Sequence, residues 1–131
     1  SRQFMEFYDK LSSWEHSVVK DSGLSPAQMH TIEVIGDNRN MMMRELADRL
    51  GITTGSLTVA VDRLEKMGMV ERQPHEHDRR SWLVVLTDRG KEMFEQHSRF
   101  HREFTQEIAH DLSAQEIETL TLLMNRILQR M

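Results

Sequence analysis

The stretch MRELADRLGITTGSLTVAVDRLEKMGMVERQ, residues 43–73, decides the fold. Apolar residues at helical spacing predict a helix over 42–50, and Gly51 ends it because glycine adopts positive φ without strain. A second helix is predicted to run to Met67, with Thr53 or Thr54 as the N-cap that accepts a bond from a backbone N–H. Two short helices joined by a tight, glycine-containing turn indicate a helix-turn-helix.

The segment after these two helices has the pattern of a β-hairpin. Residues 69–72 and 81–86 predict two short strands, the second rich in Val and Leu, and the polar residues 73–80 predict the loop between them. A hairpin directly behind a helix-turn-helix is a wing. The sequence therefore predicts a winged helix-turn-helix, a module that binds DNA.

Further amphipathic helices flank this module. Apolar periodicity predicts helices over 2–20, 89–109 and 113–130, and another helix that Ser25 caps and Pro26 begins. The fold class is therefore mainly α: a winged helix-turn-helix with a three-helix core and a β-hairpin wing, plus additional N- and C-terminal helices. At 131 residues the chain is expected to form a single domain, 1–131, with the winged lobe at about 37–88.

The terminal helices carry more apolar surface than one small domain needs. The last helix repeats apolar residues along one stripe: Ile117, Leu120, Leu123, Met124, Ile127 and Leu128. We expect helices 2–20, 89–109 and 113–130 to join two copies in a symmetric homodimer, because operators are read as two half-sites about one helical turn apart. The alternative is that these helices only pack on one another.

Composition and charge narrow the class of protein. The sequence has no Cys, no signal peptide and no apolar run near the roughly 18 residues of a membrane span, so we expect a cytoplasmic protein with no membrane partner. The net charge is −4, but residues 39–91 hold ten Lys and Arg against eight Asp and Glu, whereas the remainder holds seven against thirteen. This distribution fits a protein that touches DNA with one face.

The sequence resembles the MarR family of bacterial transcriptional regulators. The segments that carry the resemblance are MRELADRLGI at 43–52, VDRLEKMGMVER at 61–72 and DRRSWLVVLT at 78–87. The resemblance covers the whole chain and implies a dimeric winged-helix protein with a repressor-type role. An enzyme is not expected, because the sequence has no nucleophile motif and no glycine-rich phosphate loop.

The second helix of the motif supplies candidates for reading DNA, because such a helix enters the major groove by its N-terminal end. The candidate DNA-contacting residues are Thr54, Gly55, Ser56, Thr58, Val59 and Arg63. Hydroxyl groups can contact base edges or phosphates, Val59 can contact a thymine methyl group, and Arg63 a phosphate. The alternative role for Thr54 and Ser56 is helix capping.

The wing loop adds Asp78, Arg79 and Arg80 to the candidate DNA-contacting residues. The family resemblance implies that Arg80 enters the minor groove and that Asp78 braces it. An Arg side chain gains from the concentrated negative potential of a narrow minor groove. The alternative is a solvated cluster of surface charges. The expected partner is a pseudo-palindromic, double-stranded DNA operator.

Seven histidines in 131 residues require an explanation. His97 and His101 fall on the inward apolar stripe of helix 89–109, four residues and therefore about one turn apart. Neighbouring imidazoles at this spacing can share one metal ion. His30 lies on a helix face that should point to the core, and Glu15 and His16 lie on the first helix.

This group is similar to the site of one branch of the MarR family, the zinc-uptake regulators. The resemblance implies a Zn²⁺ ligand set of His30, His97, His101 and Glu15, with His16 as the alternative to Glu15. That branch has a second site that uses Cys, which this chain lacks. The other possible effector is a small phenolic or aromatic anion, bound without metal in a crevice lined by Trp14, His30, His97 and Phe100.

Overall fold

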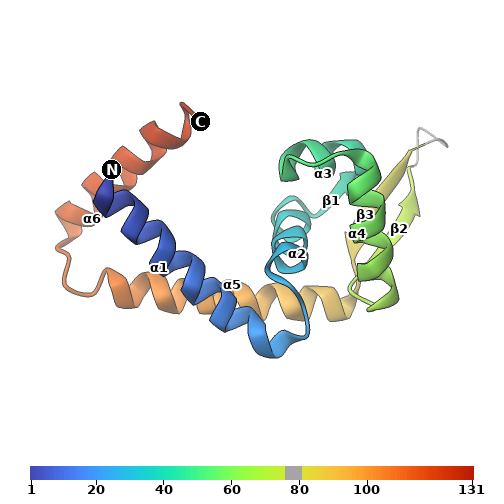
Figure 1. The fold of residues 1–131 in the computed structure, drawn as a ribbon, viewed down its shortest axis with the longest axis horizontal. Helices are drawn as coiled ribbons and strands as arrows, with labels where there is room; N and C mark the ends of the chain where they lie inside the picture. Colours follow the sequence, from blue (N-terminus) through green and yellow to red (C-terminus); the bar gives the residue numbers. More distant parts are fainter. Residues whose placement is uncertain (76–80) are drawn as a thin grey trace. The chain divides into compact units, whose positions relative to one another are not determined.

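Capping residues and short turns set the element boundaries in the computed structural model, which describes residues 1–75 and 81–131 (Figure 1). The helices are α1 (Arg2–Val19), the 3₁₀ helix η1 (Lys20–Ser22), α2 (Pro26–Asn38), α3 (Met43–Leu50), α4 (Thr54–Lys66), α5 (Asp88–Ile108) and α6 (Ala114–Leu128). The strands are β1 (Asn40–Met42), β2 (Val70–Pro74) and β3 (Trp82–Leu86). The predicted fold class, mainly helical with a winged helix-turn-helix, is confirmed.

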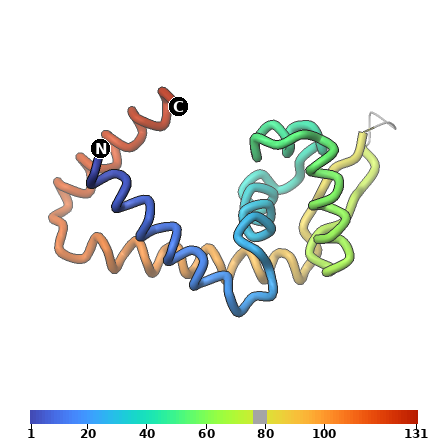
Figure 2. Tube along the Cα trace, viewed as in Figure 1, coloured from blue at the N-terminus to red at the C-terminus, as the bar shows by residue number. Residues whose placement is uncertain are grey.

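The chain divides into two compact units, residues 1–98 and 99–131. The first contains α1 to α4, the three strands and the N-terminal half of α5, and the second contains the rest of α5 and α6 (Figure 2). Among the described residues, no helix is both long and apolar enough to span a membrane.

The turn of the helix-turn-helix is fixed by local chemistry. Gly51 follows α3 in the left-handed conformation, with φ at 64°. Thr53 caps α4, because its Oγ1 accepts a bond from the Ser56 backbone N–H at 3.1 Å. Thr53 is therefore the N-cap among the two predicted candidates. At the start of α2, Ser25 and Gln28 form a reciprocal capping box with bonds of 3.2 and 2.8 Å.

The core of the first unit lies between α2, α3, α4 and a three-stranded antiparallel sheet in the order β1–β3–β2. Val84 at the centre of β3 pairs with Met41 of β1 and with Arg72 of β2. Val84 and Leu86 are buried and alternate with less buried neighbours, as expected for a sheet that covers a core with one face. The largest fully buried core side chains include Met29, Ile32, Ile35, Leu46, Leu57, Leu64 and Met69.

Strand β1 is not among the predicted elements. The sequence pattern predicts a turn over 37–40, whereas α2 continues to Asn38, whose Nδ2 donates to the Val34 carbonyl at 2.7 Å. Arg39, with φ at 65°, then redirects the chain into β1. The strand has three residues and is defined by its pairing with the distant β3, and such pairing leaves no local sequence pattern.

Two glycines allow α5 to pack closely within the first unit. A Cβ at Gly36 of α2 would lie 2.4 Å from the ring of Phe94, and a Cβ at Gly90 would lie 2.0 Å from the carbonyl oxygen of Met69. The Gly90 N–H also donates to Oγ1 of Thr87 at 3.1 Å, at the start of α5. The N-terminal half of α5 is thus held directly against α2 and the corner between α4 and β2.

We expect Gly90→Ala to destabilise the first unit by about 1–3 kcal/mol, because the added methyl group would collide with a backbone oxygen rather than with a movable side chain. Urea denaturation followed by circular dichroism would measure the change. Gly55→Ala is the matched control, since its Cβ would meet only Oγ1 of Thr53, at 3.9 Å. Equal unfolding midpoints for the two variants would contradict the close packing of α5.

The second unit exposes most of its apolar residues. Ser113 caps α6, and its hydroxyl and backbone N–H both donate to the Glu116 carboxylate, which lowers the pKa of Glu116. None of residues 99–131 is buried. The apolar stripe from Ile117 to Leu128 remains between 41% and 60% exposed. The face that the sequence predicts to be apolar is therefore uncovered within one chain.

Candidate nucleic-acid interface and effector site

Helix α4 presents a surface of short, mostly polar side chains to solvent. Leu57, Val61 and Leu64 bury one side of the helix in the core. The opposite side carries six of the predicted DNA-contacting residues, and all six are exposed: Thr54, Gly55, Ser56, Thr58, Val59 and Arg63. Val59 is 52% exposed although it is apolar. A surface of short side chains with hydroxyl and methyl groups is one that a DNA groove can approach closely.

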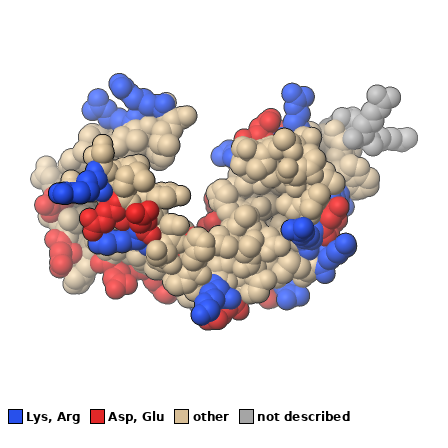
Figure 3. Space-filling model, in the orientation of Figure 1, with Lys and Arg blue, Asp and Glu red and all other residues tan. Residues whose placement is uncertain are grey.

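The charges around this surface are dispersed. On the face of the first unit seen in Figure 3, Lys and Arg side chains are scattered over the lobe that contains α2, α3 and α4, with Asp and Glu side chains between them. This pattern agrees with the small basic excess of residues 39–91. Affinity for DNA would therefore depend on a few placed contacts more than on a broad basic patch.

Arg72 of β2 holds the hairpin against α4. Its backbone N–H donates to Glu65 at 3.0 Å, and its guanidinium pairs with the Glu65 carboxylate. The guanidinium also donates to Asp62 at 2.7 Å and reaches the Thr58 carbonyl at 3.5 Å. Charge-assisted bonds of this kind fix the orientation of two elements well. Sequence reasoning missed this role, although Asp62 and Glu65 lie three residues apart on α4, before a strand that contains Arg72.

The predicted DNA-contacting residues of the wing loop lie outside the described residues: Asp78, Arg79 and Arg80. The strands that lead to them are paired in antiparallel register, from Val70 opposite Leu86 to Pro74 opposite Trp82. These two paired strands form a hairpin at the position where the sequence predicts the wing.

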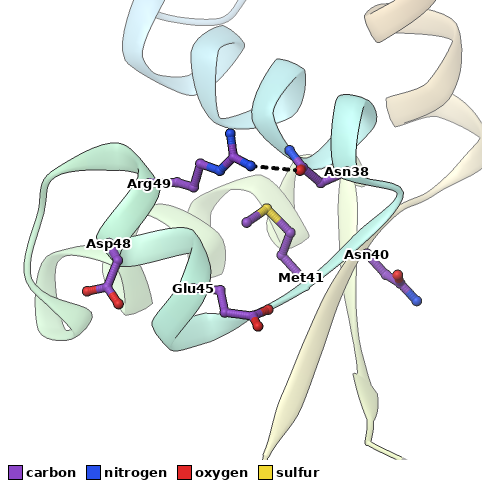
Figure 4. Close-up of a pocket in the computed structure, with 6 residues that line it drawn as sticks. All are labelled: Asn38, Asn40, Met41, Glu45, Asp48 and Arg49. Atoms are coloured by element: carbon purple, nitrogen blue, oxygen red, sulfur yellow. Dashed lines mark hydrogen bonds between the residues drawn. The ribbon is translucent and has the colours of Figure 1, made fainter. Parts of the chain in front are cut away.

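A cavity of about 640 Å³ lies at the junction of α2, β1 and α3 (Figure 4). It is lined by Asn38, Asn40, Met41, Glu45, Asp48 and Arg49. Arg49 donates to Oδ1 of Asn38 at 3.2 Å, and Glu45 accepts the Met42 backbone N–H at 3.1 Å as part of the cap of α3. None of the predicted site residues lines this cavity, and we assign these polar groups a structural role.

A buried histidine meets two carboxylates inside the first unit. The side chain of His97 is 1% exposed, and its Nε2 lies 3.0 Å from Oε1 of Glu15 and 3.4 Å from Oε1 of Glu33. One ligand atom from each of the three residues lies within 4.8 Å of those from the other two. Imidazole and carboxylate groups in such a cluster can either form ion pairs around a protonated histidine or bind a divalent cation.

The register between α2 and α5 explains this meeting. Phe94 packs over Gly36, and three residues further along α5 His97 lies beside Glu33, three residues earlier in α2. His101 follows His97 by four residues in the same helix and is partly buried. Because four residues advance an α-helix by about one turn, His101 continues the same side of α5.

The structure corrects the predicted position of His30. Its side chain is 63% exposed, and its Nδ1 lies 3.7 Å from Oε2 of Glu33 rather than within the cluster. Helix α2 buries Met29 and Ile32, so Glu33, directly after Ile32, is the polar residue carried toward α5. Sequence reasoning missed Glu33. The available signal was a carboxylate set between the apolar Ile32 and Val34 in the middle of the helix.

His16, the predicted alternative to Glu15, does not join the cluster. It is exposed, and its Nδ1 lies 2.7 Å from the Ser12 carbonyl of its own helix. Glu15, the next residue back, is the member of α1 that reaches His97. Of the predicted set, the structure therefore brings together Glu15 and His97, with His101 one turn further along α5.

Comparison with known proteins identifies the family. A model described as "MarR family" matches residues 22–81. The crystal structure of the reduced form of MarR from E. coli is 30% identical to this chain, with a TM-score of 0.77, and the match covers 97% of this chain and 94% of that one. The chain belongs to the MarR family. HTH-type transcriptional regulator BilQ of Clostridium symbiosum is a similar protein, 30% identical over 122 residues that cover 92% of this chain and 84% of BilQ.

Solved structures similar to this chain include complexes with DNA. One of them is FabT of Streptococcus pneumoniae in complex with DNA, which is 26% identical, has a TM-score of 0.89, and is matched over 98% of this chain and 92% of that one. The chain spans 59–64% of the length of the first curated relatives that it matches. The MarR family relatives are transcriptional regulators rather than enzymes, as the sequence predicts.

Proposed function

We propose that this protein is a dimeric, sequence-specific, DNA-binding transcriptional regulator of the repressor type. The observation that carries the proposal is the exposed side of α4, where short polar side chains lie opposite a buried apolar side and next to an antiparallel wing. A helix of this kind reads base edges in the major groove. The DNA complex of the related FabT supports the proposal.

The residues of α4 and the wing would contact different parts of the DNA. The N-terminal turns of α4, from Thr54 to Val59, would face base edges, with Val59 against a thymine methyl group. Arg63, further along the exposed side, would bind a phosphate and set the register of the helix. Arg80, braced by Asp78, would enter the adjacent minor groove, where the negative potential is concentrated.

A second copy of the chain would cover the exposed apolar surfaces. At the start of α1, Phe4, Phe7 and Tyr8 are 50–62% exposed, and the apolar stripe of α6 is similarly open. Large apolar side chains that gather on an exposed helix face in this way usually mark an interface. A symmetric dimer would present two α4 helices to the two halves of a pseudo-palindromic operator.

For the effector, we propose a divalent metal ion, with Zn²⁺ as the first candidate. Two carboxylates close together repel each other unless positive charge lies between them, and Glu15 and Glu33 both approach the buried His97. With His101 from the next turn of α5, these residues offer the nitrogen and oxygen donors that Zn²⁺ accepts in a four-coordinate site. The ion would tie α1 and α2 to α5.

Binding of metal would act on DNA affinity through the positions of these helices. The N-terminal half of α5 packs on α2 and on the corner between α4 and β2, so an ion that fixes α5 against α1 and α2 also constrains the winged lobe. A ligand shifts such an equilibrium only by the difference in its affinity for the two arrangements.

An organic anion is the second candidate effector. One observation favours it, at a place other than the predicted crevice: a cavity of about 240 Å³ whose lining combines the apolar Leu50, Ile52 and Ala60 with the basic side chains of His30 and Arg63. Of the residues predicted to line the crevice, this cavity includes only His30. Pockets for small ligands usually combine an apolar wall with a few polar groups. Because Arg63 is also a candidate phosphate contact, an anion bound there would compete with DNA, whereas a metal ion at His97 would not.

The DNA-binding proposal predicts that Arg80→Ala weakens binding by about 1–3 kcal/mol, or roughly 5- to 150-fold, because a charge-assisted contact to DNA is lost. The probe is a duplex selected from a random-sequence pool with the wild-type protein. Affinity would be measured by gel shift at one stated salt concentration, since phosphate contacts make it strongly salt-dependent.

Arg130→Ala is the matched control for this variant, because it removes the same charge from an exposed position after the end of α6. It should bind the selected duplex as the wild type does. Equal affinity of Arg80→Ala and Arg130→Ala would contradict the wing assignment. Failure of the wild-type protein to enrich any duplex would overturn the proposed function itself.

A further inference from the structure

Trp82 is a large aromatic residue that the protein core does not use. It begins β3 and is 49% exposed, whereas Val84 and Leu86 on the same strand are buried. Tryptophan is highly buried on average, so an exposed indole at the loop end of a hairpin suggests a surface that contacts another molecule. The indole also carries one N–H group that can only donate.

The sheet register shows which way Trp82 faces. Side chains two residues apart on a strand lie on the same face, and directly paired residues of neighbouring strands share that face. Trp82 therefore shares a face with Val84, with its partner Pro74 and with Arg72, the partner of Val84. The Arg72 side chain on this face bonds to Asp62 and Glu65 of α4. Trp82 thus lies on the side of the hairpin that faces α4.

The position along α4 follows from the same contacts. Strand β2 runs back along α4 from the tight turn after Lys66 (Figure 1). Within that strand, Arg72 already reaches the carbonyl of Thr58. From Val70 to Pro74 the strand advances about 13 Å, which corresponds to about nine residues of α-helix. The pair of Pro74 and Trp82 is therefore level with the N-terminal half of α4, next to the turns proposed to enter the major groove.

We propose that Trp82 is a DNA-backbone contact that sets the spacing between the recognition helix and the wing on the operator. This inference rests on the proposed function. The sugar–phosphate strand that separates a major groove from the adjacent minor groove must pass between α4 and the wing, on the side where Trp82 is exposed. The indole N–H would donate to a phosphate oxygen, and the ring would lie against the neighbouring deoxyribose.

A backbone contact positions the protein but reads no base. Loss of Trp82 should therefore weaken binding to every duplex by the same factor and leave the preferred sequence unchanged. Loss of a residue that contacts base edges, such as Val59, should instead change the sequence preference. This difference separates a positioning residue in the hairpin from a specificity residue in α4.

The protein has only two tryptophans, so Trp14→Phe leaves Trp82 as the single indole. In this background, saturation with the selected duplex should change the emission of Trp82 and protect it from acrylamide quenching. Trp82→Phe, which keeps a ring but loses the N–H donor, should lower affinity about 3- to 10-fold. Trp82→Ala should lower it by about 10-fold or more, equally for the selected and a scrambled duplex.

Gln73→Ala is the matched control, because Gln73 is exposed on the opposite face of the same hairpin and should be replaceable without loss of affinity. Thermal melting of each variant would show that the fold is kept. If the background protein binds the duplex while Trp82 emission and the affinity of Trp82→Ala stay unchanged, the role of Trp82 is refuted and the proposed function stands. If the wild-type protein enriches no duplex, both fail.

Discussion

Replacing both histidines of α5, in His97→Ala/His101→Ala, should lower the affinity for Zn²⁺ by at least about 100-fold. Loss of even an outer-shell partner typically costs ~10–100-fold in metal affinity, and this variant removes two proposed ligands. Calorimetric titration with zinc would measure the change, and elemental analysis of the purified protein would show which metal it carries. Equal zinc binding by variant and wild type, or none by either, would refute the metal site.

Three further variants sharpen this test. His75→Ala/His110→Ala also removes two imidazoles, but neither belongs to the cluster, so its zinc affinity should match the wild type. Glu33→Gln and His30→Ala separate the two possible ligand sets. The structure places Glu33 beside His97 and leaves His30 exposed, so Glu33→Gln should lose zinc affinity and His30→Ala should keep it. The reverse result would restore the ligand set that the sequence predicts.

His97 is buried, and its replacement removes the imidazole whose Nε2 lies 3.0 Å from Glu15 and 3.4 Å from Glu33. The double variant could therefore lose stability as well as metal. His101→Ala alone, at a partly buried position, keeps that arrangement and should still weaken zinc binding. The DNA affinity of His101→Ala should no longer respond to zinc. Zinc can change the DNA affinity only by as much as its own affinity differs between the two arrangements of the helices, and this difference is lost with the zinc site.

Local signals account for most of the fold that the sequence predicts. Ser25, Thr53 and Ser113 cap helices because their side chains bond to backbone N–H groups within the next turn, an interaction visible in the sequence itself. Gly51 ends α3 for an equally local reason. Strand β1 could not be predicted from local signals, because it is a strand only through its pairing with β3, more than forty residues away.

The candidate effector site could also be predicted only in part, because it too depends on contacts between elements that are distant in the sequence. Spacing alone places His97 and His101 on one side of α5, but it does not say which residue of α2 meets them. That choice depends on the close packing of Phe94 on Gly36, which sets the register of two helices and brings Glu33 to His97. His30 and Glu33 are three residues apart and therefore only about 60° apart around the helix, so their spacing does not decide between them, and tertiary packing selects Glu33.

The apolar stripe of α6 leads to the second large prediction: Leu120→Glu/Leu123→Glu should convert a dimer into a monomer. Both leucines are close to half exposed within one chain, at 49% and 48%. Two carboxylates at the centre of an interface would have to be buried without partners, which costs several kcal/mol per charge. Light scattering at micromolar concentration would measure the mass. A monomeric wild-type protein would refute the dimer outright.

The same variant should bind the selected duplex at least about 100-fold more weakly, although every proposed DNA-contacting residue is intact. Linked binding modules gain affinity because the second contact becomes intramolecular, and a monomer loses that gain. Gln115→Glu/Gln129→Glu adds the same two charges on the other side of the helix from the stripe and should remain dimeric. If the leucine variant is monomeric yet keeps full affinity, one winged lobe suffices for recognition, and the two-half-site arrangement must be abandoned.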